Sequence, residues 1–510
     1  MTGAKQSVGT THRRSSEVRS TTKTIVSGVR LNEKLSMADD FGRRAAHALL
    51  ERPLSTLLLL AEDGFDECAV LGPVQVEQLC ASFPKIRILV ESSRTRCFSD
   101  AEYLEAGATL VKRQPGGDFA DLRGSRTPSP DVVLSTKQPY GRLIPGARQF
   151  AFYNVHRGQD HQLLRAMLAV DRHRHGTVVF TPFPYVAVDY ELVLNDRGRR
   201  MLQFGSWAGR VGMLNTLAAL GVLYPDSPFA GLKAAREYDS YGRALHVLAG
   251  VSARVHSHGI TRPFVIGVIG HGDVSAGAQE VLDDMWGSGL YESLTPAELL
   301  LRVRAGALKN KIYKVVFSRQ DRYVAAGQVM GPGHGFNAAH YESEPERYAS
   351  RMAEYVMHLD ALVNAVHWEP RYPRLLTDRD LYRIARTGQR LIIADITCDR
   401  RGSIPTPEIT HDASRPFLLW NGIGGSMAGW TDLAPGTDLP AGYIPILAND
   451  RLPRDLARDA SEAFAASFLP YLTAIARGGD DGELERQRAI VDAALAVGCT
   501  LNPKISAAIV

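Results

Sequence analysis

The sequence predicts an α/β protein in which largely parallel sheets form two domains. Short apolar runs alternate with helix-like stretches along the chain, which is the pattern of repeated βα units. One apolar run, at residues 264–269, leads directly into a glycine-rich turn and a second helix-like stretch. The chain has 510 residues, more than one hydrophobic core usually organises, so we expect at least two domains.

The first domain is expected over residues 51–200. Apolar runs at residues 57–60, 86–90 and 132–134 predict its first strands, and residues 150–153 and 177–180 continue the pattern. Gly72-Pro73 opens a helix-like run that ends near Ser82, and Asp100 opens another.

The second domain is expected over residues 201–395. It begins with a helix near residues 204–220, whose small residues are spaced for close packing and which we interpret as an interdomain helix. Strands are predicted at residues 264–269, 311–317 and 391–395. Residues 396–510 are expected to return to the first domain, with helices at residues 454–471 and 481–497.

Composition narrows the class of protein. The chain is 45% hydrophobic and 22% charged, as in globular proteins, and much of its small net charge of +4 lies in the first 45 residues. Residues 1–50 therefore read as a flexible basic tail, and we expect no nucleic-acid partner. The sequence has no apolar run of the roughly 18 residues that a membrane span needs, and its five cysteines show no metal-site spacing. We expect a cytoplasmic protein with no membrane partner and no metal.

The turn after residues 264–269 resembles a phosphate-binding loop. Gly270 and Gly272 allow backbone N–H groups to approach a pyrophosphate, and the helix that follows directs the positive end of its dipole at the same place. Gly277 is expected to let this helix pack closely on the strand, although Ser275 occupies the place of the third glycine in G-x-G-x-x-G. An ordinary βα turn is the alternative. The expected cofactor-binding residues are Gly270, Gly272, Asp273, Val274, Ser275, Gly277, Ser318 and Arg319.

Seven blocks of sequence, in the same order, resemble the lysine-ketoglutarate reductase (saccharopine-forming) family, which is related to alanine dehydrogenase and transhydrogenase. The blocks lie at residues 98–108, 134–139, 189–209, 270–279, 367–377, 395–404 and 452–461. The resemblance implies two Rossmann-like domains, one binding dinucleotide and one discontinuous domain binding substrate, with an active-site cleft between them. It also implies NADP(H) or NAD(H) as cofactor, used to oxidise or reduce a secondary amine that joins an amino acid to a keto acid.

The resemblance also assigns roles to residues. Lys137 matches the acid–base lysine of the family, Glu191 an acid near the substrate amine, and Asp395 an acid near the cofactor. The alternative for Lys137 is a solvated surface lysine, and a neighbouring acid, Asp189, could serve only as a strand-end cap. Arg319, which follows an expected strand, is positioned to pair with a 2′-phosphate, so NADPH is expected to be preferred; a solvated arginine is the alternative.

The substrate half departs from the family pattern. The family's second acid–base residue, a histidine, aligns with Asn154, while His156 lies two residues further along, on the same face if the segment is extended. We expect His156 to contribute to catalysis less than Lys137, with a structural histidine as the alternative. The family's amino-terminal arginines are absent from residues 61–70, and Pro405 replaces a glutamate. The expected substrate-binding residues are Arg96, Asn154, Arg157 and Gln159.

These departures favour a changed amine substrate in a specialised biosynthetic pathway. Two other hypotheses stay open: a non-redox enzyme that keeps NAD tightly bound, and a catalytically inactive module that binds dinucleotide. We expect a small amino-acid substrate as the partner, and a homodimer is one possible assembly.

Overall fold

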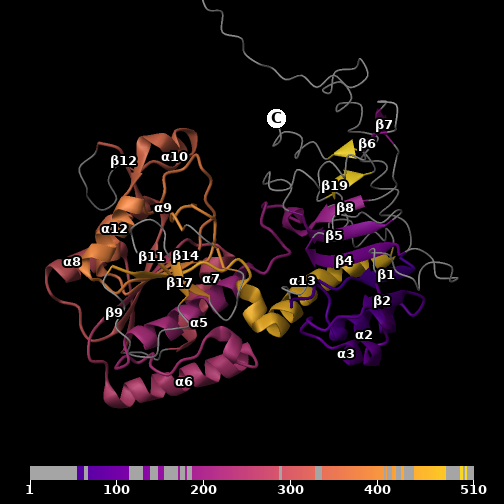
Figure 1. Ribbon diagram of the computed structural model, residues 1–510, viewed down its shortest axis with the longest axis horizontal. Helices are drawn as coiled ribbons and strands as arrows, with labels where there is room; N and C mark the ends of the chain where they lie inside the picture. Colours follow the sequence, from indigo (N-terminus) through magenta and orange to yellow (C-terminus); the bar gives the residue numbers. More distant parts are fainter. Residues whose placement is uncertain are drawn as a thin grey trace, which may run out of the picture.

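The computed structural model describes residues 54–62, 67–113, 130–137, 147–153, 170–172, 178–180, 186–285, 290–327, 336–406, 409–410, 416–420, 427–429, 442–477, 494–497 and 500–501. Within these segments the chain forms two eight-stranded sheets, which lie in two separate bodies of the molecule (Figure 1). The predicted α/β class is confirmed. The predicted tail at residues 1–50 lies outside the described residues.

The first sheet is parallel over most of its width, because βα connections return each strand to the same edge. Helices α2 (Pro73–Ser82), α3 (Asp100–Glu105) and α13 (Ala457–Arg477) contribute to the apolar core beside it. In spatial order its strands are β20 (Thr500–Leu501), β19 (Ala494–Val497), β8 (Val186–Asp189), β5 (Arg148–Phe152), β4 (Val132–Lys137), β1 (Thr56–Leu59), β2 (Arg87–Glu91) and β3 (Thr109–Val111).

The second sheet is parallel from its first strand to its sixth. Helices α5 (Gly205–Leu223), α6 (Tyr241–His258) and α7 (Asp273–Met285) share one core with it, and α8 (Pro296–Arg304) and α12 (Asp378–Thr387) share another. In spatial order its strands are β10 (Tyr291–Leu294), β11 (Ile312–Phe317), β9 (Phe264–Ile269), β14 (Ala361–Asn364), β15 (Ile392–Asp395), β18 (Ile444–Leu447), β16 (Phe417–Trp420) and β17 (Met427–Gly429).

Shorter elements fill the connections. A separate hairpin contains the predicted strand at residues 177–180, which pairs outside the first sheet. These elements are β6 (Val170–Arg172), β7 (Val178–Phe180), η3 (Tyr190–Leu192), η4 (Ala235–Glu237), α9 (Arg319–Arg322), β12 (Tyr323–Ala325), α10 (Ala338–Ser343), η5 (Pro345–Arg347), β13 (Tyr348–Ser350), α11 (Met352–Tyr355), η6 (Val356–His358) and η8 (Leu452–Leu456).

The structure corrects two expectations about the end of the chain. The chain does not return to the first domain at residue 396, because β16, β17 and β18 extend the second sheet beyond β15. The return comes with η8 and α13. The helix predicted at residues 481–497 is also wrong at its end, because residues 494–497 form strand β19, which pairs antiparallel with β8.

Helix α5 packs against α7 at very short range. A side chain at Gly209 would place its Cβ 1.9 Å from the carbonyl oxygen of Val274, and one at Gly277 would lie 2.0 Å from that of Ser206. Gly277 therefore permits contact with α5, whereas the sequence had suggested contact with the preceding strand. Helix α5 itself belongs to the core of the second domain.

Helix α13, together with η8, is the element that connects the two cores. Leu456 and Ala460 pack into the core of the second domain, whereas Phe464 and Phe468 pack into that of the first. Phe464 also stacks on Phe204 with ring centroids 4.7 Å apart, immediately before α5 begins. Figure 1 shows α13 between the two bodies. None of the described helices is long and apolar enough to cross a membrane.

Candidate functional site

The turn between β9 and α7 has the geometry of an anion-binding loop. Gly270 has a φ of +104°, and a Cβ there would lie 2.7 Å from Val366, so this position requires glycine. At Gly272 the result is the opposite: apart from the chain immediately next to it, no described atom lies within 4 Å of an added Cβ. Bare backbone therefore faces open space at the amino terminus of a 13-residue helix, which is the arrangement that binds phosphate groups.

The predicted residues that follow divide into supporting and exposed positions. The Ser275 side chain is fully buried and its hydroxyl donates a 2.7 Å hydrogen bond to the Gly270 carbonyl, so it closes the turn and does not face a ligand. Gln279 donates to the same hydroxyl at 3.0 Å. Val274 is half-buried and packs against the core of the second domain.

Asp273 carries a negative charge at the start of α7, where a phosphate would also lie. Its carboxylate accepts hydrogen bonds from Arg199 and from the Gln203 side chain. The arginine thus offsets a charge that would otherwise repel an anion at the turn.

Ser318 and Arg319 lie at the same edge of the sheet as the glycine turn. They follow β11, which pairs directly with β9 so that Phe317 lies opposite Ile269. Ser318 is the residue before the short helix α9, and its backbone N–H donates to the Asp321 carboxylate at 2.8 Å. Arg319 is about half exposed and forms an ion pair with Glu342, a residue that the sequence did not single out.

Asp395 lies at the end of β15 and is part of a buried network. Asn364, at the end of the neighbouring β14, donates hydrogen bonds to Asp395 at 2.8 Å and to Ser403 at 2.9 Å. The Thr397 hydroxyl donates to the same Asp395 oxygen at 2.8 Å. Burial raises the pKa of Asp395 to about 6, against the opposing effect of the hydrogen bonds. The side chain is 1% exposed, so its direct role is to hold the loop that follows.

That loop places a second carboxylate in a more accessible position. Cys398 and Arg401 adopt left-handed backbone conformations with φ of 53° and 52°, which are costly for residues other than glycine and cluster at functional sites. Asp399 lies between them and is half-buried. Gly402 fits closely against it, because an added Cβ would lie 2.6 Å from the Asp399 Cβ. The sequence analysis missed Asp399; its spacing of four residues from Asp395 in a glycine-containing loop was the available signal.

In the first domain, Lys137 ends β4 with an exposed side chain. Its backbone N–H donates to the Glu62 carboxylate at 3.1 Å, and the same carboxylate accepts from the N–H of Thr136. Glu62 follows β1, within the segment from which the family's arginines are missing. The Glu62 carboxylate therefore holds the backbone at Lys137 in place, a contact that the sequence did not predict.

Glu191 and Asp189 lie at the end of β8. The Asp189 side chain accepts a 3.0 Å hydrogen bond from the Glu191 N–H, which is the capping role that the sequence left open. Glu191 is 7% exposed and pairs with Arg200 at 2.9 Å. Arg199 and Arg200, adjacent in the connecting segment, thus contact the second and the first domain respectively.

The predicted substrate-binding residues are mostly untested by the structure. Arg96 is buried, donates to the Glu91 carbonyl at 3.1 Å and pairs with Asp100 at 3.3 Å, so it braces the end of β2. The remaining predicted residues of the substrate half, which follow β5, lie outside the described residues: Asn154, His156, Arg157 and Gln159.

The two sheets, with a glycine turn at the carboxyl edge of one, define a two-domain α/β class with a Rossmann-type domain. A solved structure of L-alanine dehydrogenase has this fold, with 16% identity and a TM-score of 0.51, over 89% of this chain and 99% of the other. No family model matches the chain.

Curated relatives define the relationship more closely. Alpha-aminoadipic semialdehyde synthase of Arabidopsis thaliana is 28% identical over 407 residues, and the mitochondrial protein of that name from Rattus norvegicus is 24% identical over 465. These alignments include 76% and 87% of this chain but 35% and 46% of the relatives, so the chain spans less than half of their length. They confirm the resemblance to the lysine-ketoglutarate reductase and saccharopine dehydrogenase family.

Proposed function

We propose that the chain is an NAD(P)-dependent oxidoreductase acting on the CH–NH bond of a secondary amine, or the corresponding imine, that joins a lysine-like amino acid to a keto acid. The observation that carries the proposal is the Gly270 turn, which presents bare backbone to open space at the start of α7. The relatives of the chain are named alpha-aminoadipic semialdehyde synthases, and this name supports an amino-acid substrate.

The residues of the second domain fit a dinucleotide. Gly270 and Gly272 would receive the pyrophosphate. A side chain at Gly270 would alter the turn, and a side chain at Gly272 would fill the open space in which the pyrophosphate would lie. Ser275 and the Arg199–Asp273 pair keep the turn closed and its charge balanced. When bound, the nicotinamide would donate or accept the hydride.

NADPH is the proposed preference. Arg319 follows the strand beside β9, where an adenosine ribose is expected in this fold, and guanidinium groups bind phosphate through paired hydrogen bonds. The ion pair with Glu342 lowers this preference, because a 2′-phosphate must compete with the carboxylate for Arg319.

Lys137 is the proposed acid–base group. Its exposed side chain extends from the carboxyl end of β4, and the Glu62 carboxylate fixes the backbone from which it projects. The ammonium group of Lys137 can protonate the carbinolamine hydroxyl, which leaves as water when the imine forms. The neutral lysine amine can then accept a proton from the substrate as a general base. Asp399, which is half-buried where Asp395 is fully buried, is the carboxylate of the second domain that we assign to the site.

A changed substrate follows from the carboxylate-binding residues. Arg96 is held by Glu91 and Asp100, so it does not supply a replacement for the missing arginines. Glu62 instead provides negative charge at the same sheet edge, which favours a substrate with an amine or other donor there. We therefore propose a lysine-like substrate with fewer carboxylates than the family's product.

The test is a steady-state screen of the full chain, measuring NADPH and NADH consumption with lysine-like amines paired with keto acids. We expect consumption that requires both members of one pair. Substrate turnover without net consumption would instead indicate a tightly bound NAD. Dinucleotide binding without turnover of any pair would indicate an inactive module.

A further inference from the structure

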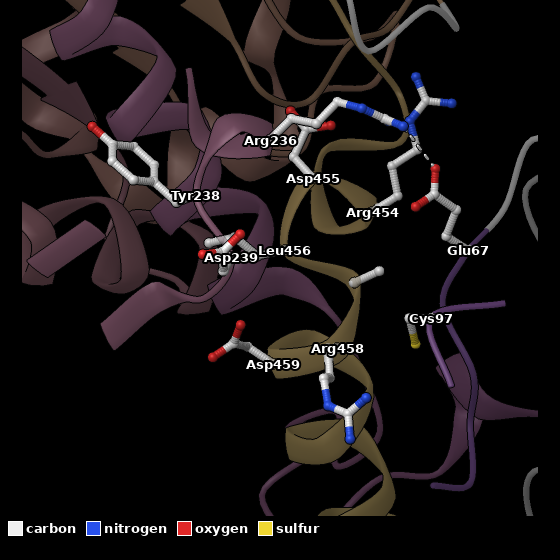
Figure 2. A pocket seen from close by; sticks show the side chains of 11 residues that line it. Glu67, Cys97, Arg236, Tyr238, Asp239, Arg454, Asp455, Leu456, Arg458 and Asp459 are labelled. Carbon is white, nitrogen blue, oxygen red and sulfur yellow. Dashed lines mark hydrogen bonds and ion pairs between the residues drawn. The ribbon is translucent and has the colours of Figure 1, made fainter. Parts of the chain in front are cut away.

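A cavity lies where η8 leads into α13. Its volume is about 230 Å³, below the roughly 300 Å³ at which pockets for drug-sized ligands start, so it suits a smaller molecule. It is lined by Glu67 and Cys97 of the first domain, by Arg236, Tyr238 and Asp239 of the second, and by residues 454–459 of the connecting element. Figure 2 shows these side chains around the space.

The cavity is separate from the glycine turn. Helix α5 starts beside that turn, where an added Cβ at Gly205 would lie 3.4 Å from Val274, and Asn215 contacts the cavity residue Asp455. Ten residues separate Gly205 from Asn215, which corresponds to about 15 Å along a helix. A ligand here would therefore not occupy the dinucleotide site.

Asp455 is a buried carboxylate with an unused acceptor. It is 6% exposed, and one oxygen accepts from the Asn215 amide at 3.3 Å, while the other has no hydrogen-bond partner among the described residues. Asn215 is held in turn by the Ala235 N–H, which donates to it at 2.7 Å. Leaving a buried acceptor unsatisfied costs about 1–3 kcal/mol, and more for a charged group, so the free oxygen indicates a missing donor.

The charges around Asp455 are of both signs. Arg454 is 6% exposed beside it, and Arg236 and Arg458 line the same cavity. Arg458 is half exposed and also pairs with Glu102 at 2.6 Å and with Glu462 at 3.5 Å. Arg236 pairs with Glu67 at 3.1 Å, but both side chains are more than a third exposed, and such pairs contribute little and exchange readily. Asp239 is exposed and has no ion pair within the described part of the chain.

These charges distinguish between kinds of ligand. A simple cation would be repelled by the arginines, and a simple anion by the aspartates. A metal ion lacks ligands, because no group of three acidic, histidine or cysteine side chains in the described segments could hold one. A small molecule with an ammonium group and a carboxylate group can pair with both the aspartates and the arginines of the cavity.

We propose that this cavity binds a small α-amino acid, with its ammonium group on Asp455 and its carboxylate facing Arg236, Arg454 and Arg458. Because the lining comes from both domains and from the element that connects them, the occupied cavity holds the domains in one relative position. The proposal does not depend on the reaction assigned to the cleft.

The test uses isothermal titration of the full chain with glycine, L-alanine, L-glutamate and L-lysine. We expect at least one of these amino acids to bind. n-Butylamine has only the ammonium group and propionate only the carboxylate, so each should bind at least about tenfold more weakly. Asp455→Asn should weaken binding by about tenfold or more, because the removed charge is buried. Lys137→Met should leave it unchanged, which separates this cavity from the substrate site.

Two further measurements keep the test decisive. If Asp455→Asn does not fold, Asp239→Asn, at an exposed position, should still weaken binding relative to Asp226→Asn, an exposed control outside the cavity. Burial raises the pKa of Asp455 to about 6, against Asn215, Arg454 and Arg236, which lower it, while Glu67 raises it further. Binding should therefore weaken about tenfold from pH 7 to pH 5 in the wild type. The proposal is overturned if none of the four amino acids binds, if propionate binds as tightly as they do, or if the aspartate variants bind like the wild type.

Discussion

At the scale of single residues, Gly270 and Gly272 lack a side chain for different physical reasons. Gly270 has a positive φ and almost no room for a Cβ, whereas Gly272 has room, and its bare backbone faces the space that we propose for the ligand. Substitution at Gly272 therefore tests binding without disturbing the fold.

We predict that Gly272→Val lowers dinucleotide affinity by an order of magnitude or more, because its side chain would occupy the space beside the pyrophosphate. The measurement is calorimetric titration with NADPH and NADH. Ala276→Val, at an exposed position in the first turn of α7, is the matched control and should bind normally. Equal affinities for the two variants would contradict the assignment.

Lys137→Met should lower turnover by at least about two orders of magnitude and leave dinucleotide binding intact, since general acid–base catalysis contributes about 10²–10⁴ in rate. His156→Ala should cost less. Steady-state rates of both variants with the active substrate pair show which of the two residues contributes more to acid–base catalysis. The reverse order of effects would transfer the acid–base role to the histidine.

Asp395 should affect stability more than catalysis. Its pKa is raised to about 6 in the folded protein, from 3.8, so the folded state keeps its proton longer than the unfolded state. Stability is consequently lost as pH rises from about 4 to about 6, by an upper limit on the order of 3 kcal/mol. Urea unfolding across this range should show a shallower pH dependence for Asp395→Asn, whereas Asp399→Asn should reduce turnover. If the free energy of unfolding of Asp395→Asn depends on pH as steeply as that of the wild type, the Asp395 carboxyl does not cause the loss of stability.

At the scale of elements, local patterns predicted the strands that carry strong apolar runs and the turn after β9. The grouping of β16, β17 and β18 with the second sheet had no such signal, because β16 runs antiparallel to both of its neighbours and all three strands are short. Residues 494–497 are predicted as the end of a helix, but pairing with β8 makes them a strand, so tertiary contacts override the local pattern. Ion pairs such as Arg319–Glu342 join residues 23 apart in sequence and could not be predicted from spacing alone.

The ion pair between helices α9 and α10 should set cofactor preference. Glu342→Gln removes the carboxylate that competes for Arg319, so the preference for NADPH over NADH should rise several-fold, whereas Arg319→Ala should abolish it. Ratios of kcat/KM for the two dinucleotides measure both effects. Retained discrimination in Arg319→Ala would assign the 2′-phosphate to another residue.

At the scale of the whole molecule, two domains are connected by α13, by the stacked pair Phe204 and Phe464, and by the adjacent arginines 199 and 200. Arg199 pairs with Asp273 at the glycine turn and Arg200 with Glu191 in the first domain. This short segment therefore joins the glycine turn to the first domain, and the predicted cleft would lie between the groups that it joins.

The most direct test of the proposed oxidoreductase is isotope transfer. The full chain is incubated with NADPH or NADH deuterated at nicotinamide C4, on either face, together with each pair from the screen, and the product is examined by mass spectrometry. A secondary amine that carries one deuterium at the carbon derived from the keto acid, formed in step with dinucleotide oxidation, is the predicted result. Product without deuterium from either labelled face, or no product from any pair while dinucleotide binds at the Gly270 turn, would contradict the assignment of hydride transfer to this chain.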